Sequence, residues 1–239
     1  MDLSDQRVAI IGGTSGIGLA TARLAVAAGA SVVVAGRRRE RVDDAVARVG
    51  VAAEGAVVDA TSADDLVSFF GRVGPLDHLV LAQSGGEGGG AFRTLDLAAL
   101  RHAFDAKFWS HVTAARLGLH ALRPDGSLTF VTAIAARAAL PDTAGLAAVN
   151  GALEAMVAPL ALELRPLRVN AVSPGVIATP YWDGLPVTQR AALFDQSARA
   201  APVGRVGQPE DIARVIILLL GNGFMTGSVL ACDGGLRLA

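Results

Sequence analysis

The stretch that decides the fold is Val8-Ala9-Ile10-Ile11-Gly12-Gly13-Thr14-Ser15-Gly16-Ile17-Gly18. An apolar run typical of a buried strand enters a glycine-rich turn, and a helical pattern follows to Ala28. Glycines in such a turn let the chain reverse tightly, let the backbone approach a phosphate and let the helix pack close to the sheet. Free N–H groups at the positive helix end attract an anion. We interpret the stretch as a phosphate-binding turn rather than a simple tight turn, with these contact residues: Gly12, Thr14, Ser15, Gly16, Ile17 and Gly18.

Apolar runs alternate with longer helical patterns along the rest of the chain. Together with the first run they predict about seven strands, at residues 31–35, 56–58, 79–81, 128–131, 168–172 and 228–231. A turn is expected at Asp125-Gly126 and a glycine-rich loop at residues 85–90. Such alternation predicts an α/β fold, a doubly wound, mostly parallel sheet with helices on both faces. With 239 residues, 52% of them hydrophobic, and no visible linker, we expect one domain over residues 1–239.

Composition and charge exclude several classes of protein. The formal net charge of −1 gives no overall field to attract nucleic acid or an anionic membrane. Cys232 is the only cysteine, so no intrachain disulfide can form and a reducing cytoplasm is expected. The first five residues lack the features of a signal peptide, and the apolar run at residues 215–220 is too short to span a bilayer. We therefore expect a cytoplasmic protein with a small-molecule substrate and with no metal, nucleic-acid or membrane partner.

The end of the second strand predicts which cofactor binds. Sites that prefer NAD place an acid there to bind the ribose hydroxyls, whereas an arginine suits a 2′-phosphate. Gly36 stands at the expected position of the acid, and Arg37 and Arg38 follow it. We interpret the pair as a phosphate contact that selects NADP(H) over NAD(H). The alternative is a solvated basic helix start, which is unfavourable without an anion.

Residues 179–202 form a long stretch, interrupted by three prolines, that follows the carboxyl end of a predicted strand. Ligands of open α/β sheets bind outside those ends, so the stretch is expected to be a substrate lid; the alternative is a peripheral helical insertion. Tyr181 and Trp182 at its start are candidate apolar substrate contacts, or packing residues only.

Taken together, these motifs resemble the short-chain dehydrogenase/reductase family over nearly the whole chain. The first motif matches the family's TGxxxGIG pattern with Ile11 in place of threonine, and Asp59 matches the acid that meets the adenine. The most specific matches are residues 170–180, 208–213 and 233–235. The resemblance implies a Rossmann-type domain, a homotetramer or homodimer, and further cofactor contacts at Ala82, Asn150, Pro174, Gly175, Ile177 and Thr179.

The departures from the family pattern are equally specific. The NNAG stretch is replaced by Leu81-Ala82-Gln83-Ser84, and the family's asparagine, serine, tyrosine and lysine fall on Lys107, Ala133, Leu146 and Asn150. Reduction of a carbonyl by hydride creates an alkoxide that needs a proton, which the family's tyrosine supplies. Leu146 cannot donate one, and Ala133 cannot form a side-chain hydrogen bond. Thr132, next to Ala133, could offer a hydroxyl instead.

Lysine and asparagine have exchanged places between positions 107 and 150. Because the resemblance implies that both positions face one pocket, we expect Lys107 to be an electrostatic or proton-donating group and Asn150 to hold the ribose. Alternatively, Lys107 is a surface or interface lysine on an amphipathic helix. His111, one turn later, could titrate near neutrality or be structural. Arg137 could meet an acidic substrate or be solvated.

The sequence therefore predicts a divergent NADP-dependent oxidoreductase that transfers hydride to a carbonyl-like or imine-like small molecule without the usual tyrosine acid. Two alternatives remain on the same fold. One is a non-redox enzyme such as an isomerase or cyclase, and the other is an NADP(H)-binding protein without catalysis. The preserved phosphate-binding turn and the exchange at positions 107 and 150 favour an enzyme over a protein that has lost catalysis, although a fold alone does not decide function.

Overall fold

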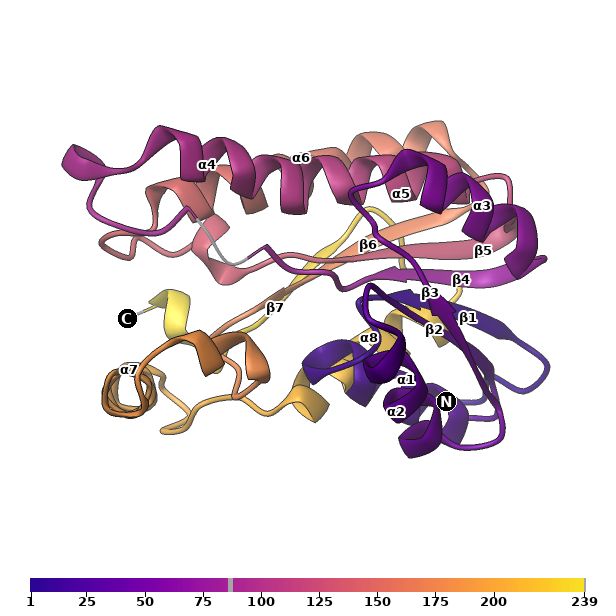
Figure 1. Ribbon diagram of the computed structural model, residues 1–239, viewed down its shortest axis with the longest axis horizontal. Helices are drawn as coiled ribbons and strands as arrows, with labels where there is room; N and C mark the ends of the chain where they lie inside the picture. The colour runs from indigo at the N-terminus through magenta and orange to yellow at the C-terminus, as the bar shows by residue number, and fades with distance from the viewer. Residues whose placement is uncertain (86–87, 239) are drawn as a thin grey trace.

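Seven parallel strands form the centre of the fold in the order β3-β2-β1-β4-β5-β6-β7 (Figure 1). The computed structural model describes residues 1–85 and 88–238, so part of the predicted glycine-rich loop at 85–90 lies outside the described residues. The order confirms the doubly wound sheet, and it reverses direction between β1 and β4, where ligands of such sheets bind. The strands are β1 Arg7–Ile11, β2 Ser31–Gly36, β3 Ala53–Val57, β4 Leu76–Leu81, β5 Leu122–Val131, β6 Arg168–Pro174 and β7 Val229–Cys232.

Helices cover both faces of the sheet (Figure 1). On one face lie α3 Ala63–Val73, α4 Leu97–Ala103, α5 Ser110–Gly118 and α6 Ala144–Glu163; on the other lie α1 Gly16–Ala27, α2 Arg39–Val49 and α8 Pro209–Gly221. The remaining helix, α7 Val187–Ala200, lies near the C-terminus, and short helical turns span Phe92–Thr94, Phe104–Trp109 (η2), Ile134–Ala136 (η3), Pro180–Gly184 (η4) and Leu236–Leu238.

Two apolar clusters, one on each face, hold the helices to the sheet. Alternate residues of β1 supply both clusters: Ala9 and Ile11 face α3 and α6, whereas Val8 and Ile10 face α1 and α8. This follows from the two-residue period of a strand, whose successive side chains point to opposite faces. A sheet buried on both faces needs strands that are apolar throughout, which the sequence supplies.

Helix α6 is long and apolar enough, by length and composition, to cross a membrane, and among the described residues it is the one helix that passes this test. It packs on the sheet through Leu153 and Val157, as the core helix of a globular domain does. An apolar groove along α4 and η2 is lined by Leu97, Leu100, Phe104 and Trp109 together with two charged residues. The expected homotetramer or homodimer stays a prediction.

Two local predictions were wrong. Asp125 and Gly126 do not form a turn but lie within β5, where the pairing with β4 slips between Leu122 and Ser127. Gly126 packs directly against the backbone carbonyl of Asp77, which leaves no space for a side chain. The third strand is Ala53–Val57 rather than 56–58, because it lies at the sheet edge and carries exposed residues that an apolar pattern does not detect.

Arg168 joins β6 to the end of α8. The residue is only 8% exposed. Nη1 donates to the carbonyl oxygens of Leu219 (2.7 Å) and Met225 (3.2 Å), and Nη2 donates to that of Leu220 (2.7 Å). The last carbonyls of a helix lack intrahelical partners, and they carry partial negative charge. The Arg168 guanidinium supplies these carbonyls with both hydrogen-bond donors and a positive charge.

We predict that replacing Arg168 by Met lowers the free energy of unfolding by about 2–3 kcal/mol, because buried carbonyl groups lose a charged donor. Urea unfolding at a fixed protein concentration measures the change. The matched control is Arg48→Met, which removes an exposed arginine whose ion pair with Asp44 is 3.5 Å long; it should shift stability by no more than ~0.5 kcal/mol. Equal effects of the two substitutions would contradict the capping role.

Candidate active site

The turn between β1 and α1 is shaped so that only glycine fits at two positions. Gly12 has a φ of +86°, and a Cβ there would lie 2.5 Å from the backbone nitrogen of Gln83. A Cβ at Gly18 would overlap the carbonyl of Gly12. Within the described residues the side chain of Ser15 caps no N–H of α1, and the first turn of that helix carries no acid. The turn therefore presents free N–H groups and a positive helix end, which fit a phosphate.

The predicted 2′-phosphate contacts gather at the end of β2. A Cβ at Gly36 would lie 2.6 Å from the Cγ2 atom of Thr14, so the threonine methyl fills the space where an acidic side chain would begin. Arg37 and Arg38 are exposed at this edge. Hydrogen bonds from Thr61 lower the pKa of the Asp59 carboxyl, and the nearby charge of Arg37 lowers it further. Arg37 and Asp59 thus belong to one end of the predicted cofactor site.

The segment after β6 approaches the same turn. The methyl carbon of Thr179 lies 3.1 Å from the position that a Cβ of Gly16 would take. Gly175 packs against Asp233, where a Cβ would be 2.8 Å from the Asp233 Cα. The backbone nitrogen of Ala82 donates to the Ile11 carbonyl at 2.8 Å. The structure therefore brings the predicted residues from the ends of β1, β4 and β6 to one edge of the sheet.

Lys107 is the only lysine in the chain, and it lies in η2, a six-residue π-helical turn between α4 and α5. Such turns are rare and occur frequently at functional sites. The residue is 8% exposed, and its Nζ donates to the Thr132 carbonyl at 3.4 Å. Burial lowers the pKa of the ammonium from 10.5 to about 8, although the Glu154 carboxylate acts in the opposite direction. The alternative of a surface lysine is therefore wrong.

Leu146 and Asn150, two of the other unusual positions, lie on α6, which packs against η2. Asn150 is 2% exposed and its Nδ2 donates to the Leu146 carbonyl at 2.8 Å. Its Oδ1, like both side-chain polar atoms of Gln83, is buried with no hydrogen-bond partner in the described part of the chain. Buried polar groups almost always have partners, so these atoms fit hydrogen bonds from a cofactor, a substrate or water. Leu146 is half-buried, and the backbone of Gly89 lies against its side chain.

Thr132, the nearest hydroxyl to Ala133, faces the interior. The residue is 3% exposed, and its Oγ1 lies 2.8 Å from Glu154 Oε1 and 3.1 Å from the Val172 carbonyl, two acceptors for its one proton. The hydroxyl is thus engaged inside the fold. Its predicted role as a substitute for the family's serine is not favoured by this geometry.

Glu154 is the site residue that sequence reasoning missed. Its carboxylate accepts hydrogen bonds from Thr132, from Ser173 Oγ at 2.7 Å and from Arg137 Nε at 2.6 Å. The side chain is 8% exposed. The signal was present in the sequence, because Glu154 lies one helical turn after Asn150 and therefore on the same face of a strongly apolar helix. Arg137, expected to meet an acidic substrate or to be solvated, is exposed and pairs with Glu154.

His111 is fully buried on α5, and its Nδ1 donates to the Lys107 carbonyl at 2.7 Å. Burial, assisted by the charge of Lys107, lowers the pKa of the imidazole from 6.5 to about 3. Burial therefore favours the neutral imidazole, and of the two roles left open for His111 the structure favours the structural one.

The stretch predicted to be a lid forms η4 and α7. Tyr181 is 42% exposed, and burial of the remainder raises the pKa of its phenol. Its ring centroid lies 4.7 Å from that of Trp182, whose Nε1 donates to the Ile177 carbonyl at 2.8 Å. The aromatic pair is thus anchored beside a predicted cofactor residue. Movement of the stretch as a lid stays a prediction.

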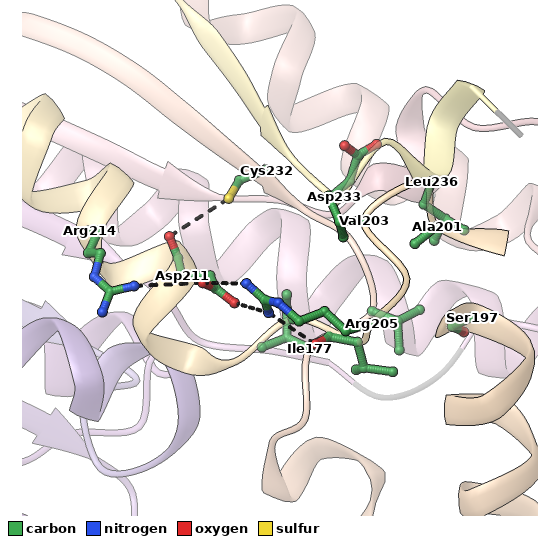
Figure 2. A pocket seen from close by; sticks show the side chains of 14 residues that line it. Ile177, Ser197, Ala201, Val203, Arg205, Asp211, Arg214, Cys232, Asp233 and Leu236 are labelled. Carbon is green, nitrogen blue, oxygen red and sulfur yellow. Dashed lines mark hydrogen bonds and ion pairs between the residues drawn. The ribbon is translucent and has the colours of Figure 1, made fainter. Parts of the chain in front are cut away.

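A cavity of about 220 Å³ lies where α7, the start of α8 and the end of β7 meet (Figure 2). Arg205 and Asp211 form an ion pair in its wall at 2.6 Å, and Cys232 lies beside them with its Sγ 3.7 Å from the Asp211 carbonyl. Burial raises the pKa of the Cys232 thiol, which does not favour a reactive thiolate. Of the predicted site residues, only Ile177 lines this cavity in the described structure.

Comparison with known proteins agrees with this geometry. The family described as enoyl-(acyl carrier protein) reductase matches residues 12–237. The chain belongs to the short-chain dehydrogenase/reductase family. It is 32% identical to cis-4-hydroxycyclohexanecarboxylate dehydrogenase of Sinomonas cyclohexanicum over 96% of each chain. It is 30% identical to a protein of Xanthobacter autotrophicus named inactive 2-(S)-hydroxypropyl-CoM dehydrogenase 2, over 90% of this chain and 98% of that one. A solved small-chain dehydrogenase in complex with NADPH is 32% identical, with a TM-score of 0.85, over 98% of this chain and 99% of that one.

Membership confirms the resemblance and places this short-chain dehydrogenase/reductase among the NAD(P)-dependent oxidoreductases. A nicotinamide cofactor is typical of the family, and the solved relative contains NADPH. The glycine turn, the uncapped start of α1 and the orphaned oxygen of Asn150 all fit such a cofactor. The roles of the individual site residues, and the absence of the usual catalytic groups, stay predictions.

We predict that Lys107 makes stability depend on pH in the alkaline range. Between pH 8 and 10.5 the unfolded chain keeps a proton that the folded chain has released, so the free energy of unfolding rises with pH in this window. Relative to the wild type, Lys107→Met should therefore be more stable at neutral pH, and that advantage should fall by an amount on the order of 3 kcal/mol across the window. Denaturant unfolding at several pH values measures it. A difference that stays constant with pH would contradict the shifted pKa, since other groups contribute to both proteins.

Proposed function

We propose that this protein is an NADP(H)-dependent oxidoreductase that transfers hydride to a carbonyl-like or imine-like small molecule, with Lys107 in place of the tyrosine acid. The observation that carries the proposal is a single buried lysine in a π-helical turn. The predicted alignment assigns an active-site residue of the family to this position. A bound nicotinamide cofactor would supply the hydride; the chain's residues must hold the two reactants and provide the proton.

Lys107 suits that task electrostatically. Its pKa of about 8 keeps the amine mostly protonated at neutral pH and close enough to neutrality to release a proton. An ammonium has three N–H donors, and the described structure gives one of them a partner, the Thr132 carbonyl at 3.4 Å. The remaining donors are available to an alkoxide or amide anion that forms in the substrate. In a site with few water molecules such a charge contributes more than it would in solution.

The preference for NADP(H) is supported by the end of β2. Position 36 has no acid to repel a phosphate, and Thr14 occupies the space where its side chain would begin. Arg37 and Arg38 follow directly and are exposed. Guanidinium groups bind phosphate through paired charge-assisted hydrogen bonds. The relative solved with NADPH supports the same cofactor.

We predict that the double substitution Arg37→Ser and Arg38→Ser weakens NADPH binding by about 10- to 100-fold, as expected for the loss of one or two charged hydrogen bonds. Binding of NADH should change less than ~2-fold, since NADH lacks the phosphate that these residues contact. Calorimetric titration of both cofactors measures the two affinities. The matched control is Arg39→Ser, an exposed arginine whose partner is Asp43 at 3.8 Å. Equal losses for NADPH and NADH would overturn the assignment.

A second candidate function is that of an NADP(H)-binding protein without hydride transfer. The observation in its favour is that Leu146 and Ala133 offer no hydroxyl, while that of Thr132 is committed to Glu154. One relative at 30% identity is itself named inactive. The two functions share the cofactor site and differ only in turnover, so one experiment separates them.

We predict that the wild type oxidises NADPH in the presence of at least one member of a panel of ketones and imines, followed by loss of cofactor absorbance. Lys107→Met should lower kcat by about 10²- to 10⁴-fold, the usual contribution of a general acid, while NADPH affinity changes little. Tyr181→Phe is the comparison variant, because Tyr181 is the only tyrosine in the chain and so its only phenol. This variant should retain most of the turnover.

Each other outcome decides a point. Tight NADPH binding with no oxidation of any substrate would favour the second candidate. Full turnover by Lys107→Met would remove the role of Lys107, and loss of turnover by Tyr181→Phe alone would transfer that role to the phenol. Failure to bind either NADPH or NADH would overturn the cofactor assignment.

A further inference from the structure

We propose that Glu154 is a positioning residue, the counter-ion that holds the Lys107 ammonium inside the fold and ties it to both strand ends that flank the site. The proposal builds on the active-site location of Lys107. It concerns a carboxylate that none of the family motifs includes. It also rests on contacts within the chain, so its test does not require that the protein turn over a substrate.

Glu154 is linked to Lys107 through one residue. Lys107 Nζ donates to the Thr132 carbonyl at 3.4 Å, and the Thr132 hydroxyl donates to Glu154 Oε1 at 2.8 Å. Thr132 thus receives a hydrogen bond from the ammonium on its backbone and passes one to the carboxylate from its side chain. The cation and the anion therefore contact the same residue.

The carboxylate is held from three directions. Oε1 also accepts from Ser173 Oγ at 2.7 Å, and Oε2 accepts from Arg137 Nε at 2.6 Å. These donors come from the end of β5, the end of β6 and the residue after η3. Three donors therefore converge on the two oxygens of the Glu154 carboxylate. Through Thr132 and Ser173, Glu154 also holds together the segments that lead to Ala133 and to Gly175.

The Lys107 ammonium and the Glu154 carboxylate are both buried, so each affects the other more strongly than it would in water. Lys107 is 8% exposed and the side chain of Glu154 is 8% exposed. A buried ammonium without a nearby anion would lose its proton at neutral pH. Chain segments packed around Lys107 bring three titratable or charged groups to it: Glu154 from α6, the neutral His111 from α5 and, beyond the carboxylate, the Arg137 cation. Glu154 is the one anion among them.

The experiment exploits the single lysine. In an untagged chain grown with ¹³Cε-lysine, one NMR signal reports the protonation of Lys107, and its titration gives the pKa directly. Replacing Glu154 by Gln should lower that pKa by on the order of one unit, whereas Glu154→Asp, which restores the charge, should bring it back toward the wild-type value. Arg137→Met should shift it in the opposite direction to Glu154→Gln, because it removes a cation that offsets the carboxylate.

Ser173→Ala is the matched control for a structural role. It removes one hydrogen bond of the cluster at 2.7 Å without changing any charge. If Glu154 acts only by packing and bonding, Ser173→Ala and Glu154→Gln should move the lysine signal alike and Arg137→Met should leave it in place. If Glu154 acts as counter-ion, the two charge-changing variants shift the pKa in opposite directions and Ser173→Ala shifts it little.

Two results would overturn the proposal. One is an unchanged Lys107 pKa in a folded Glu154→Gln protein, with folding checked by circular dichroism. If that variant does not fold, Arg137→Met decides, and an unchanged or lowered Lys107 pKa there has the same meaning. An inactive wild type would count against hydride transfer and not against Glu154, because the NMR titration needs no substrate.

Discussion

A lysine ammonium buried in a protein must find a counter-charge and hydrogen-bond acceptors inside the fold, since leaving water costs several kcal/mol for an unpaired ion. At the carboxyl edge of this sheet, the groups that meet this requirement for Lys107 come from several separate elements. Lys107 comes from the π-helical turn, its acceptor Thr132 from the end of β5, and the carboxylate of Glu154 from α6. Ser173 and Arg137 complete the cluster. Lys107 is thus held in the interior by contacts that a surface lysine would not need.

The other constraint is steric, and it acts at the switch point of the sheet. Gly12 lies against Gln83, Gly18 against Gly12, and Gly16 against Thr179. These contacts bring β1, α1, β4 and the segment after β6 so close that side chains at the glycine positions would separate them. The same closeness exposes the N–H groups of α1 to a ligand. Packing and cofactor recognition therefore depend on the same atoms, which is why a short stretch of sequence predicts both.

Much of the fold could be predicted because it follows from local periodicity. The alternation of Val8, Ala9, Ile10 and Ile11 between the two faces is a property of any strand, and the glycine turn has few other uses. The site was less predictable where partners are distant in sequence. Arg137, which follows η3, is paired with Glu154 on α6, and no pattern of residues in the sequence indicates that pairing. A histidine ordinarily titrates near neutral pH, but complete burial lowers the pKa of His111 well below that range. The glycine at 126 indicated a turn, whereas here glycine allows close approach of a neighbouring strand. In each case the deciding quantity is burial or a long-range contact, which a single sequence does not display.

Family membership assigns a class of chemistry to the protein. Which residues carry out that chemistry depends on the local geometry of the site. The predicted exchange of lysine and asparagine between positions 107 and 150 would change the geometry of the site, because the two side chains start from different elements. From α6, Asn150 turns its amide nitrogen back to the Leu146 carbonyl and leaves its oxygen open. From η2, Lys107 enters between β5 and α6 and meets Thr132. On this prediction the positive charge comes from a different element than in the family. Leu146 offers an apolar side chain and no proton donor. A proton donated by Lys107 would then pass to the substrate directly or through water, and Asn150 Oδ1, which has no partner among the described residues, is an acceptor for such a water.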